Sequence, residues 1–254
     1  MLMPNIHRYL HALRLMFIIG LLCYAAGVQA QSRTSSGGKL LVFTKTAGYR
    51  HASIPDGVAA IRLMGRQQHF RVDTTSDARW FNGRVLARYD AVVFLSTSGD
   101  MLDTVQQAAF ERYIRGGGGY LGIHGAAASE YDWSWYGGLV GAFFSNHPHP
   151  QQARLVIHPD PAFPVMDSLP NPWIRTDEWY NFRSLPRDVH VLVTVDEKSY
   201  SGGNNGAYHP LVWYHDYQGG RAFYLGLGHT PESYTDPYFL KLLDAAIHYA
   251  MGRG

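Results

Sequence analysis

Cysteine is almost absent from this chain. Cys23 is the only one among 254 residues, and it lies within the first thirty. That segment has the form of a secretory signal, with Arg8 and Arg14 before an apolar run at residues 15–26 and the small-residue motif VQA at residues 28–30. Cleavage after residue 30 would leave no cysteine, which excludes disulfides, a thiolate nucleophile and thiolate metal ligands.

A long apolar run and an excess of charge are also missing. The apolar stretch of about 12 residues is well short of the roughly 20 that span a bilayer, so we expect an exported protein, periplasmic or secreted, that leaves the membrane after cleavage. The full chain has 22 Lys+Arg and 20 Asp+Glu, and residues 1–30 contain two arginines and no acid, which leaves 20 of each. This balance does not indicate a nucleic-acid partner.

The sequence indicates one domain. Its length and 46% hydrophobic content allow one substantial core, and it contains no internal repeat or interior linker. We therefore expect a signal peptide at residues 1–30, a flexible leader at 31–38 and a single domain at 39–252. Homo-oligomer formation is left open.

Strand and helix patterns alternate in the first half. Strands are predicted at residues 39–44, 70–74, 91–96 and 120–123, and helices at 55–68 and 103–115, the latter with Asp103 and Gln106 as a capping box. The second half is less regular, with strands predicted at 153–157, 189–195, 211–214 and 221–225 and a last helix at 237–251. This order predicts an α/β fold with a central, mostly parallel sheet and helices on both faces. Ligands of such sheets bind at the carboxyl edge.

We expect one turn with glycines on both sides to lie at that edge. The run GGYLGIHGA at residues 118–126 has the form of a strand-to-helix elbow, and His124 occupies the place where hydrolases and amidotransferases carry Ser or Cys. Imidazole in that place makes acyl-enzyme chemistry improbable. If a helix begins directly after His124, its positive end favours a neutral ring that can act as a base or a hydrogen-bond donor.

Five ordered motifs resemble one family. They are FTKTAGYRH at residues 43–51, GIH at 122–124, DEWY at 177–180, HPLVW at 209–213 and GLGH at 226–229. Together they resemble the ThuA-like (trehalose utilisation) proteins over nearly the whole chain after the leader. The resemblance implies a class I glutamine amidotransferase-like, flavodoxin-like fold without the amidotransferase cysteine, and an association with disaccharide or keto-sugar metabolism.

Glu178 is the expected partner of His124. The chain has only five glutamates, and this one stands between Asp177 and two aromatic residues, whose desolvation would raise its pKa as a general acid requires. On a strand only one of Asp177 and Glu178 can face a pocket, and the resemblance favours Glu178. We therefore expect His124 and Glu178 to be catalytic.

Aromatic and histidine side chains near the motifs are the expected substrate contacts. Flat aromatic rings stack on the apolar face of a sugar, and loop histidines donate hydrogen bonds to its hydroxyls. Aromatic residues are abundant in the segment at 131–136 as well. The predicted substrate-binding residues are Tyr49, His51, Tyr180, His209, Trp213 and His229.

The chain also contains two histidines at a spacing that is common in metal sites. His147 and His149 flank Pro148, and an H-x-H pair on a strand would direct both rings to one side, although the proline argues against a strand. These two residues are weak metal candidates. No cofactor is required by the expected chemistry, and a divalent metal is left open as an alternative.

These observations favour an exported carbohydrate-active protein. It would act on a disaccharide, glycoside or 3-keto sugar by general acid–base chemistry, in a hydrolysis or an elimination. Two alternatives stay open: a non-catalytic carbohydrate-binding module, and a metal-dependent hydrolase that uses the histidines as ligands. A glutamine amidotransferase is excluded, because its thiol would be missing.

Overall fold

The structure is a computed structural model that describes residues 37–253. The predicted signal peptide and all but the last two residues of the predicted leader lie outside the described residues. From Gly37 on, the chain forms one compact unit. Within residues 37–253, no helix combines the length and the apolar character that crossing a bilayer requires.

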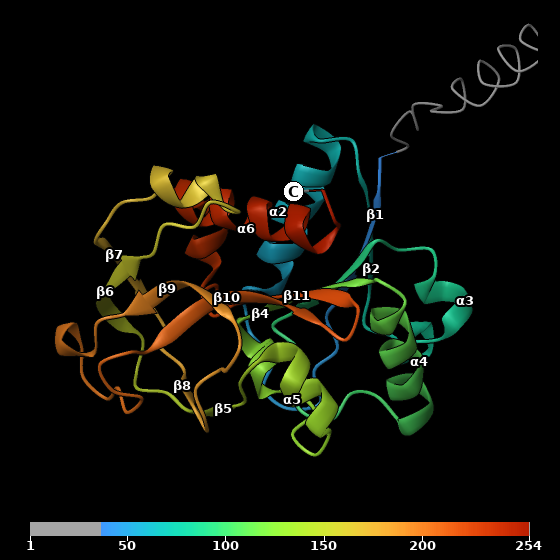
Figure 1. Ribbon diagram of the computed structural model, residues 1–254, viewed down its shortest axis with the longest axis horizontal. Coiled ribbons are helices and arrows are strands. Elements are labelled where there is room, and N and C mark those ends of the chain that lie inside the picture. The colour runs from blue at the N-terminus through green and yellow to red at the C-terminus, as the bar shows by residue number, and fades with distance from the viewer. Residues whose placement is uncertain (1–36, 254) are drawn as a thin grey trace, which may run out of the picture. The chain divides into compact units, whose positions relative to one another are not determined.

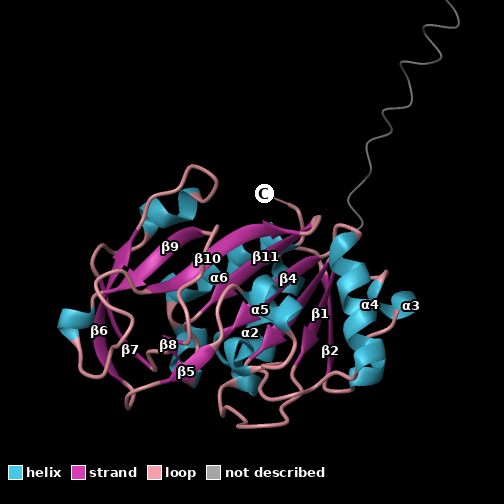
Figure 2. Ribbon diagram, turned by 60° about the horizontal axis from the view of Figure 1, so that its bottom comes forward, coloured by secondary structure: helices cyan, strands magenta, loops and turns pink. Residues whose placement is uncertain are grey.

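A nine-stranded sheet runs through the centre of the molecule (Figures 1 and 2). Five neighbouring strands are parallel, in the order β2 (Arg71–Thr75), β1 (Lys39–Phe43), β3 (Ala91–Leu95), β4 (Gly119–Ile123) and β11 (Gly220–Leu225). Four strands extend the sheet beyond β11 with antiparallel pairing, in the order β10 (Pro210–Tyr217), β9 (His190–Val195), β6 (Gln151–Ile157) and β7 (Trp173–Asp177). The described part of the chain has a second, two-stranded sheet of β5 (Phe144–Asn146) and β8 (Asn181–Phe182).

Helices cover both faces of the parallel strands (Figure 1). On one face lie α2 (Ile54–Gln67) and α6 (Pro237–Ala250), and on the other lie α4 (Thr104–Arg115) and α5 (Ser134–Val140). The short α3 (Gly83–Leu86) packs against α4. Five 3-10 helices complete the described elements: η1 (Ala78–Trp80), η2 (His124–Ala128), η3 (Pro164–Ser168), η4 (Glu197–Ser199) and η5 (Pro231–Thr235).

Local sequence explains most of these elements. Every side chain of β3 and β4 is buried, as expected of parallel strands covered on both faces. Asp103 and Gln106 form the predicted capping box at the start of α4, and Asp236 caps α6, whose first residue is a proline. The predicted α/β fold is confirmed, with an antiparallel extension of the sheet beyond the parallel strands.

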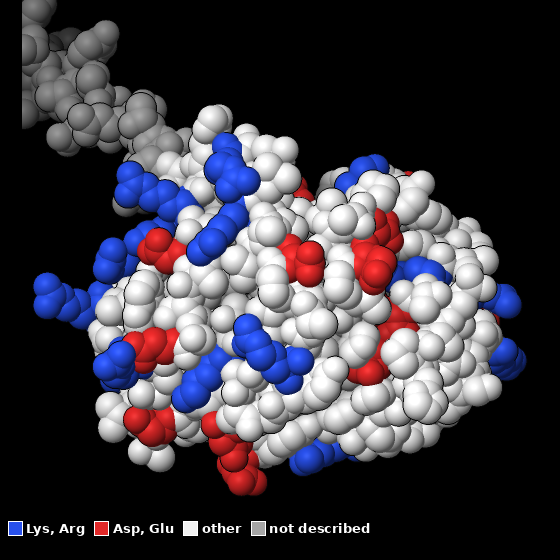
Figure 3. Space-filling model, turned by 180° about the vertical axis from the view of Figure 1, so that it is seen from behind, with Lys and Arg blue, Asp and Glu red and all other residues white. Residues whose placement is uncertain are grey.

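Charged residues of both signs are interspersed on the face of the molecule seen in Figure 3. Neither sign forms a continuous stripe there. On that face the distribution follows the near-balanced composition of the chain, 22 basic and 20 acidic residues.

Candidate active site

A cavity of about 490 Å³ lies where β1, β3, β4 and β11 end. This is the carboxyl edge of the parallel strands, at which the sequence predicts a ligand site. Its lining comes from the loops after these strands, from β5 and the loop after it, and from the segment between β7 and β8. The lining residues are Gly48, Tyr49, His51, Ser98, Gly99, Ala128, Tyr131, Phe144, His147, His149, Pro150, Glu178, Tyr180 and His229.

His124 stands on a strained elbow directly after β4. Its φ of +45° lies in the left-handed region of the backbone. For a residue other than glycine this conformation costs of order 1–3 kcal/mol, and such residues cluster at functional sites. A Cβ atom on Gly125 would lie 2.8 Å from the carbonyl oxygen of Thr97, so the residue after the histidine has no room for a side chain. The elbow predicted from the sequence is therefore present.

The elbow does not raise His124 into the cavity. The residue is 0% exposed and is not among the lining residues, although it contacts Glu178 and His229, which are. The element that follows is η2, a 3-10 helix of five residues, and not the expected α-helix. A 3-10 helix of five residues has no substantial macrodipole, so the expected effect of a helix end on the His124 ring is absent.

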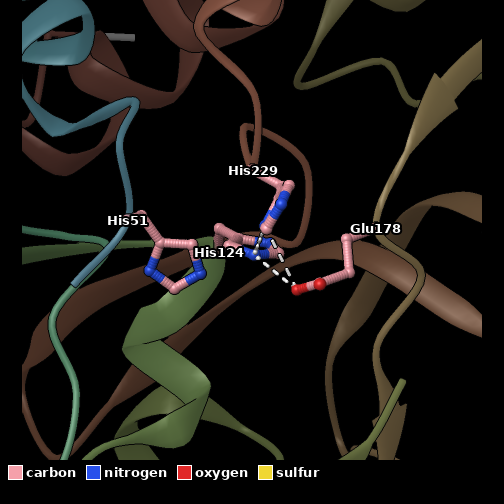
Figure 4. A group of neighbouring side chains, drawn as sticks. All are labelled: His51, His124, Glu178 and His229. Carbon is pink, nitrogen blue, oxygen red and sulfur yellow. Dashed lines mark hydrogen bonds and ion pairs between the residues drawn. The ribbon is translucent and has the colours of Figure 1, made fainter. Parts of the chain in front are cut away.

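Glu178 and His229 line the cavity and lie next to His124 (Figure 4). Glu178 follows the last residue of β7, and the chain returns from there to β8. Oε2 of Glu178 lies 3.3 Å from Nε2 of His124 and 3.2 Å from Nδ1 of His229, and these two nitrogens are 3.2 Å apart. His51, which follows β1, packs against both rings, with centroid distances of 4.7 Å to His124 and 5.2 Å to His229.

The surroundings of the cluster change its ionisation. Burial raises the pKa of Glu178, but the imidazoles of His124 and His229 beside its carboxylate outweigh burial and hold that pKa well below its ordinary value. This corrects the expectation of an acid with a raised pKa, which considered the aromatic neighbours and not the imidazoles. Burial lowers the pKa of His229, yet the adjacent Glu178 carboxylate outweighs it, so the net shift is upward.

His51 is the least satisfied member of the cluster. Its Nδ1 is buried and has no hydrogen-bond partner within the described part of the chain. Burial, together with the neighbouring imidazoles of His124 and His229, lowers the pKa of His51 to about 3. The ring is therefore neutral at physiological pH and has a buried nitrogen with an unused hydrogen-bonding capacity.

The HPH segment lies in the loop after β5, beside the cluster. Nδ1 of His147 lies 3.0 Å from Oε1 of Glu178 and 3.0 Å from the carbonyl oxygen of Pro148, so this nitrogen carries a proton and donates to both. The side chain of His147 is 40% exposed and lines the cavity together with His149. The two residues are not on a strand, so the strand geometry that would direct both rings to one side is absent.

Asp177 holds the loops that carry the cluster. Its buried carboxylate accepts backbone hydrogen bonds from Gly228 at 3.1 Å, His229 at 3.1 Å and Glu178 at 3.0 Å. It also pairs with the buried guanidinium of Arg175 at 3.0 Å. Glu178 thus faces the cavity, whereas Asp177 fixes the end of β7 to the loop after β11.

An Asp177→Asn substitution should lower the stability of the protein by about 3 kcal/mol, because it leaves the buried Arg175 without its nearest countercharge. For a domain of this size the loss corresponds to a fall of about 6 to 12 °C in the melting temperature, measurable by calorimetry. Asp236→Asn is the matched control. Asp236 contacts the same guanidinium at 3.3 Å, and asparagine still caps α6. An equal loss in both variants would contradict the role assigned to Asp177.

Two predicted substrate-binding residues lie outside the cavity. His209 is fully buried, its Nε2 donates to the carbonyl oxygen of Tyr180 at 2.8 Å, and its Nδ1 lies 2.8 Å from Glu197. It therefore supports the segment that carries Tyr180. Trp213 is buried in β10 and donates to the carbonyl oxygen of Val140. Both predictions followed motif membership, which does not distinguish supporting residues from lining ones.

The aromatic segment at 131–136 also differs from its expected role. Only Tyr131 of this segment lines the cavity. Ser134 begins α5, which buries Tyr136 completely and stacks Trp133 on Trp135 with centroids 5.1 Å apart. Phe144 is a lining residue that the sequence did not identify. A signal was available, since it precedes the HPH segment by only three residues.

The predicted tyrosines lie at the cavity as expected. Tyr49 is 67% exposed at the cavity and its ring meets the edge of His51, with centroids 4.8 Å apart. Tyr180 lies between His124 and Phe144, with its centroid 4.2 Å from each. These two residues, His51, Glu178 and His229 are brought together, and His124 lies directly beneath them.

Known structures share this fold. A ThuA-like protein from Bacteroides uniformis is 22% identical, with a TM-score of 0.71 over 87% of this chain and 94% of its own. A ThuA-like protein from Parabacteroides merdae is 21% identical, with a TM-score of 0.68 over 85% of this chain and 91% of its own. Part of a β-galactosidase from Bacillus circulans, 31% of its chain, matches 85% of this one at 11% identity and a TM-score of 0.55.

A comparison with curated proteins finds no match. The model of the ThuA family, described as trehalose utilisation, matches residues 39–250. This match includes all five motifs and every residue of the cluster. The chain therefore belongs to the ThuA family of trehalose utilisation proteins.

Proposed function

We propose that this protein is an exported carbohydrate-active enzyme that acts on a disaccharide, glycoside or 3-keto sugar by general acid–base chemistry. The observation that carries the proposal is the position of Glu178, which lines an aromatic cavity while His124 and His229 hold one of its two oxygens. Membership in a family of trehalose utilisation proteins supports a sugar as the ligand. The signal-like form of residues 1–30 supports export.

The cavity suits a small sugar. Its volume of about 490 Å³ lies within the range of ordinary ligand pockets. Tyr49, Tyr131, Phe144 and Tyr180 contribute aromatic surface, on which the apolar face of a pyranose stacks. His147 and His149 add polar groups that bind hydroxyls.

The second oxygen of Glu178 supplies the proton-transfer group. Oε1 contacts His147, and both residues line the cavity, so they can exchange protons with a bound sugar. In a 3-keto glycoside, the carboxylate removes the proton on the carbon next to the carbonyl. The electron pair forms the new double bond, the glycosidic C–O bond breaks, and the leaving oxygen takes a proton from the imidazolium form of His147, which becomes neutral. Hydrolysis is the other outcome, with water as the attacking group. His124 is a positioning residue, since it does not reach the cavity.

The test of this proposal is to incubate the purified protein with glycosides and with their 3-keto forms. Products are read by mass spectrometry, with and without a chelator, and sugar binding is measured by calorimetry. The proposal expects at least one sugar to be consumed. Binding without consumption would instead support a carbohydrate-binding module, and neither binding nor consumption would contradict the proposal.

Tyr49→Ala should weaken sugar binding about tenfold, which is the loss of one exposed stacking contact worth about 1.4 kcal/mol. The maximal turnover should change less than threefold, because Tyr49 does not contact Glu178. Tyr208→Ala is the matched control. Tyr208 is 54% exposed, and it does not line the cavity. Calorimetry compares the two variants, and equal affinities would remove Tyr49 from the binding site.

A further inference from the structure

We infer that the cluster below the cavity is a binding site for one divalent transition-metal ion. The ligands are Nε2 of His124, Nδ1 of His229 and Oε2 of Glu178, with His51 as a looser fourth ligand. The four ligand atoms lie within 4.8 Å of one another. The inference does not depend on the proposed function, because it concerns ion binding and not the substrate.

Hydrogen bonding fixes the lone pairs that face the centre of the cluster. Nδ1 of His124 lies 3.3 Å from the carbonyl oxygen of Gly226, which can only accept, so this nitrogen carries the proton. In the neutral ring Nε2 then presents a lone pair to the cluster. Oε2 of Glu178 presents lone pairs as well. The single proton that Nδ1 of His229 can carry cannot satisfy both acceptors fully, whereas one cation can bind all three atoms.

The distances in the cluster fit a metal site. Ligands at about 2.0 to 2.1 Å from a tetrahedral Zn²⁺ are separated from one another by about 3.3 to 3.4 Å. The three separations among His124, His229 and Glu178 are 3.2, 3.2 and 3.3 Å. These atoms therefore already form one face of a coordination tetrahedron.

His51 lies where a fourth ligand of the ion would be. Its ring meets His124 and His229 edge to face on the side opposite Glu178 (Figure 4). One nitrogen of its ring lies within 4.8 Å of the other three ligand atoms, so His51 can approach an ion bound there as a fourth ligand.

The residues around the cluster hold its ligands in position. Gly226 fixes the tautomer of His124, and Asp177 holds the backbone of His229 and Glu178. His147 binds the other oxygen of Glu178. Metal ligands are typically oriented by such partners. With the ion on Oε2, the pair of Oε1 and His147 stays free at the cavity for proton transfer.

The ligand set favours a particular class of ion. Imidazole nitrogens suit Zn²⁺, Co²⁺, Ni²⁺ and Fe²⁺, whereas Mg²⁺ and Ca²⁺ prefer oxygen ligands throughout. Zn²⁺ is the ion expected to bind most readily among those tested below, and Co²⁺ serves as its coloured substitute.

Calorimetry on the chelator-treated, purified protein tests the inference. Titration with Zn²⁺ should show one site, and titration with Mg²⁺ at the same concentration should show none. The variants His124→Asn, His229→Asn and Glu178→Gln should each bind Zn²⁺ more than about 100-fold more weakly, since loss of an orienting partner alone costs 10- to 100-fold. His51→Asn should lose about tenfold. His149→Asn, which changes a lining residue outside the cluster, and the distant His248→Asn should bind within twofold of the unchanged protein.

Zinc X-ray absorption on the unchanged protein covers the case in which a variant fails to fold. It should show imidazole nitrogens and a carboxylate oxygen at about 2.0 to 2.1 Å. No binding of Zn²⁺ or Co²⁺, retention of binding in the His124, His229 and Glu178 variants, or loss in His149→Asn would overturn the site. Sugar turnover that persists in the chelated protein would leave the proposed function intact, because calorimetry alone decides the metal site.

Discussion

Replacing Glu178 with glutamine should lower sugar turnover by about 100- to 10,000-fold, the range over which a positioned general acid or base contributes. Glutamine has nearly the shape of glutamate but cannot exchange a proton. Its amide also puts an NH₂ donor in place of one of the two oxygens that now accept from His147 and His229. Steady-state kinetics on the sugar identified by the screen measure the loss.

Glu197→Gln is the control for this variant. Glu197 is also bonded to a histidine, His209, at 2.8 Å, but it does not line the cavity. Turnover should stay within about threefold of the unchanged protein. Both variants are assayed with and without added Zn²⁺, and a loss in Glu178→Gln that Zn²⁺ restores would assign the residue to ion binding alone. A decrease of less than tenfold would remove Glu178 as the acid–base group.

His124→Asn should lower the maximal turnover about 100-fold and change KM by less than threefold. Asparagine keeps a short donor toward the carbonyl oxygen of Gly226 but has no atom in place of Nε2, so the group that lies 3.3 Å from Oε2 of Glu178 is lost and the carboxylate is held less firmly. KM should hardly change because His124 is 0% exposed and contacts no bound sugar. The small cavity left by the shortened side chain should reduce the unfolding free energy by about 1 to 3 kcal/mol.

The split between turnover and KM distinguishes positioning from general destabilisation. Assays are run well below the melting temperature of the variant, and circular dichroism confirms that it is folded. A rise in KM without loss of turnover would mean that His124 contacts the sugar. Unchanged turnover would mean that the strained elbow at residue 124 serves the fold alone.

The parallel half of the sheet could be predicted from sequence because each of its elements carries its own local signal. Buried apolar runs mark β3 and β4, and Asp103 with Gln106 marks the start of α4. The alternation of these elements fixes parallel pairing and places their carboxyl ends together. This is why His51 and His124 could be assigned to one region without knowledge of any contact.

The second half was harder to predict because its elements depend on tertiary contacts. The strand β7 was not predicted. In this strand the charged Asp177 is buried with Trp173, whereas the apolar Ile174 is exposed, so the alternation of apolar and polar residues does not follow the buried and exposed faces. Asp177 is buried because Arg175 and three backbone N–H groups satisfy it. No local pattern contains that information.

The direction of individual side chains was the least predictable feature of the site. The elbow at His124 was expected to expose the ring, but Glu178 and His229 lie over it. His209 belongs to a motif and supports the Tyr180 segment from behind. Glu178 was expected to have a raised pKa because aromatic neighbours adjoin it in sequence, whereas imidazoles distant in sequence determine the shift.

Deuterium exchange tests the central claim most directly. The purified protein is incubated with 3-keto glycosides in D₂O, and mass spectrometry follows deuterium at the carbons next to the carbonyl. If Glu178 removes a proton there, the unchanged protein should incorporate deuterium or release the aglycone, and Glu178→Gln should do neither above the rate without protein. Equal exchange by both proteins, or no exchange and no cleavage by the unchanged protein with any 3-keto glycoside, would contradict the account.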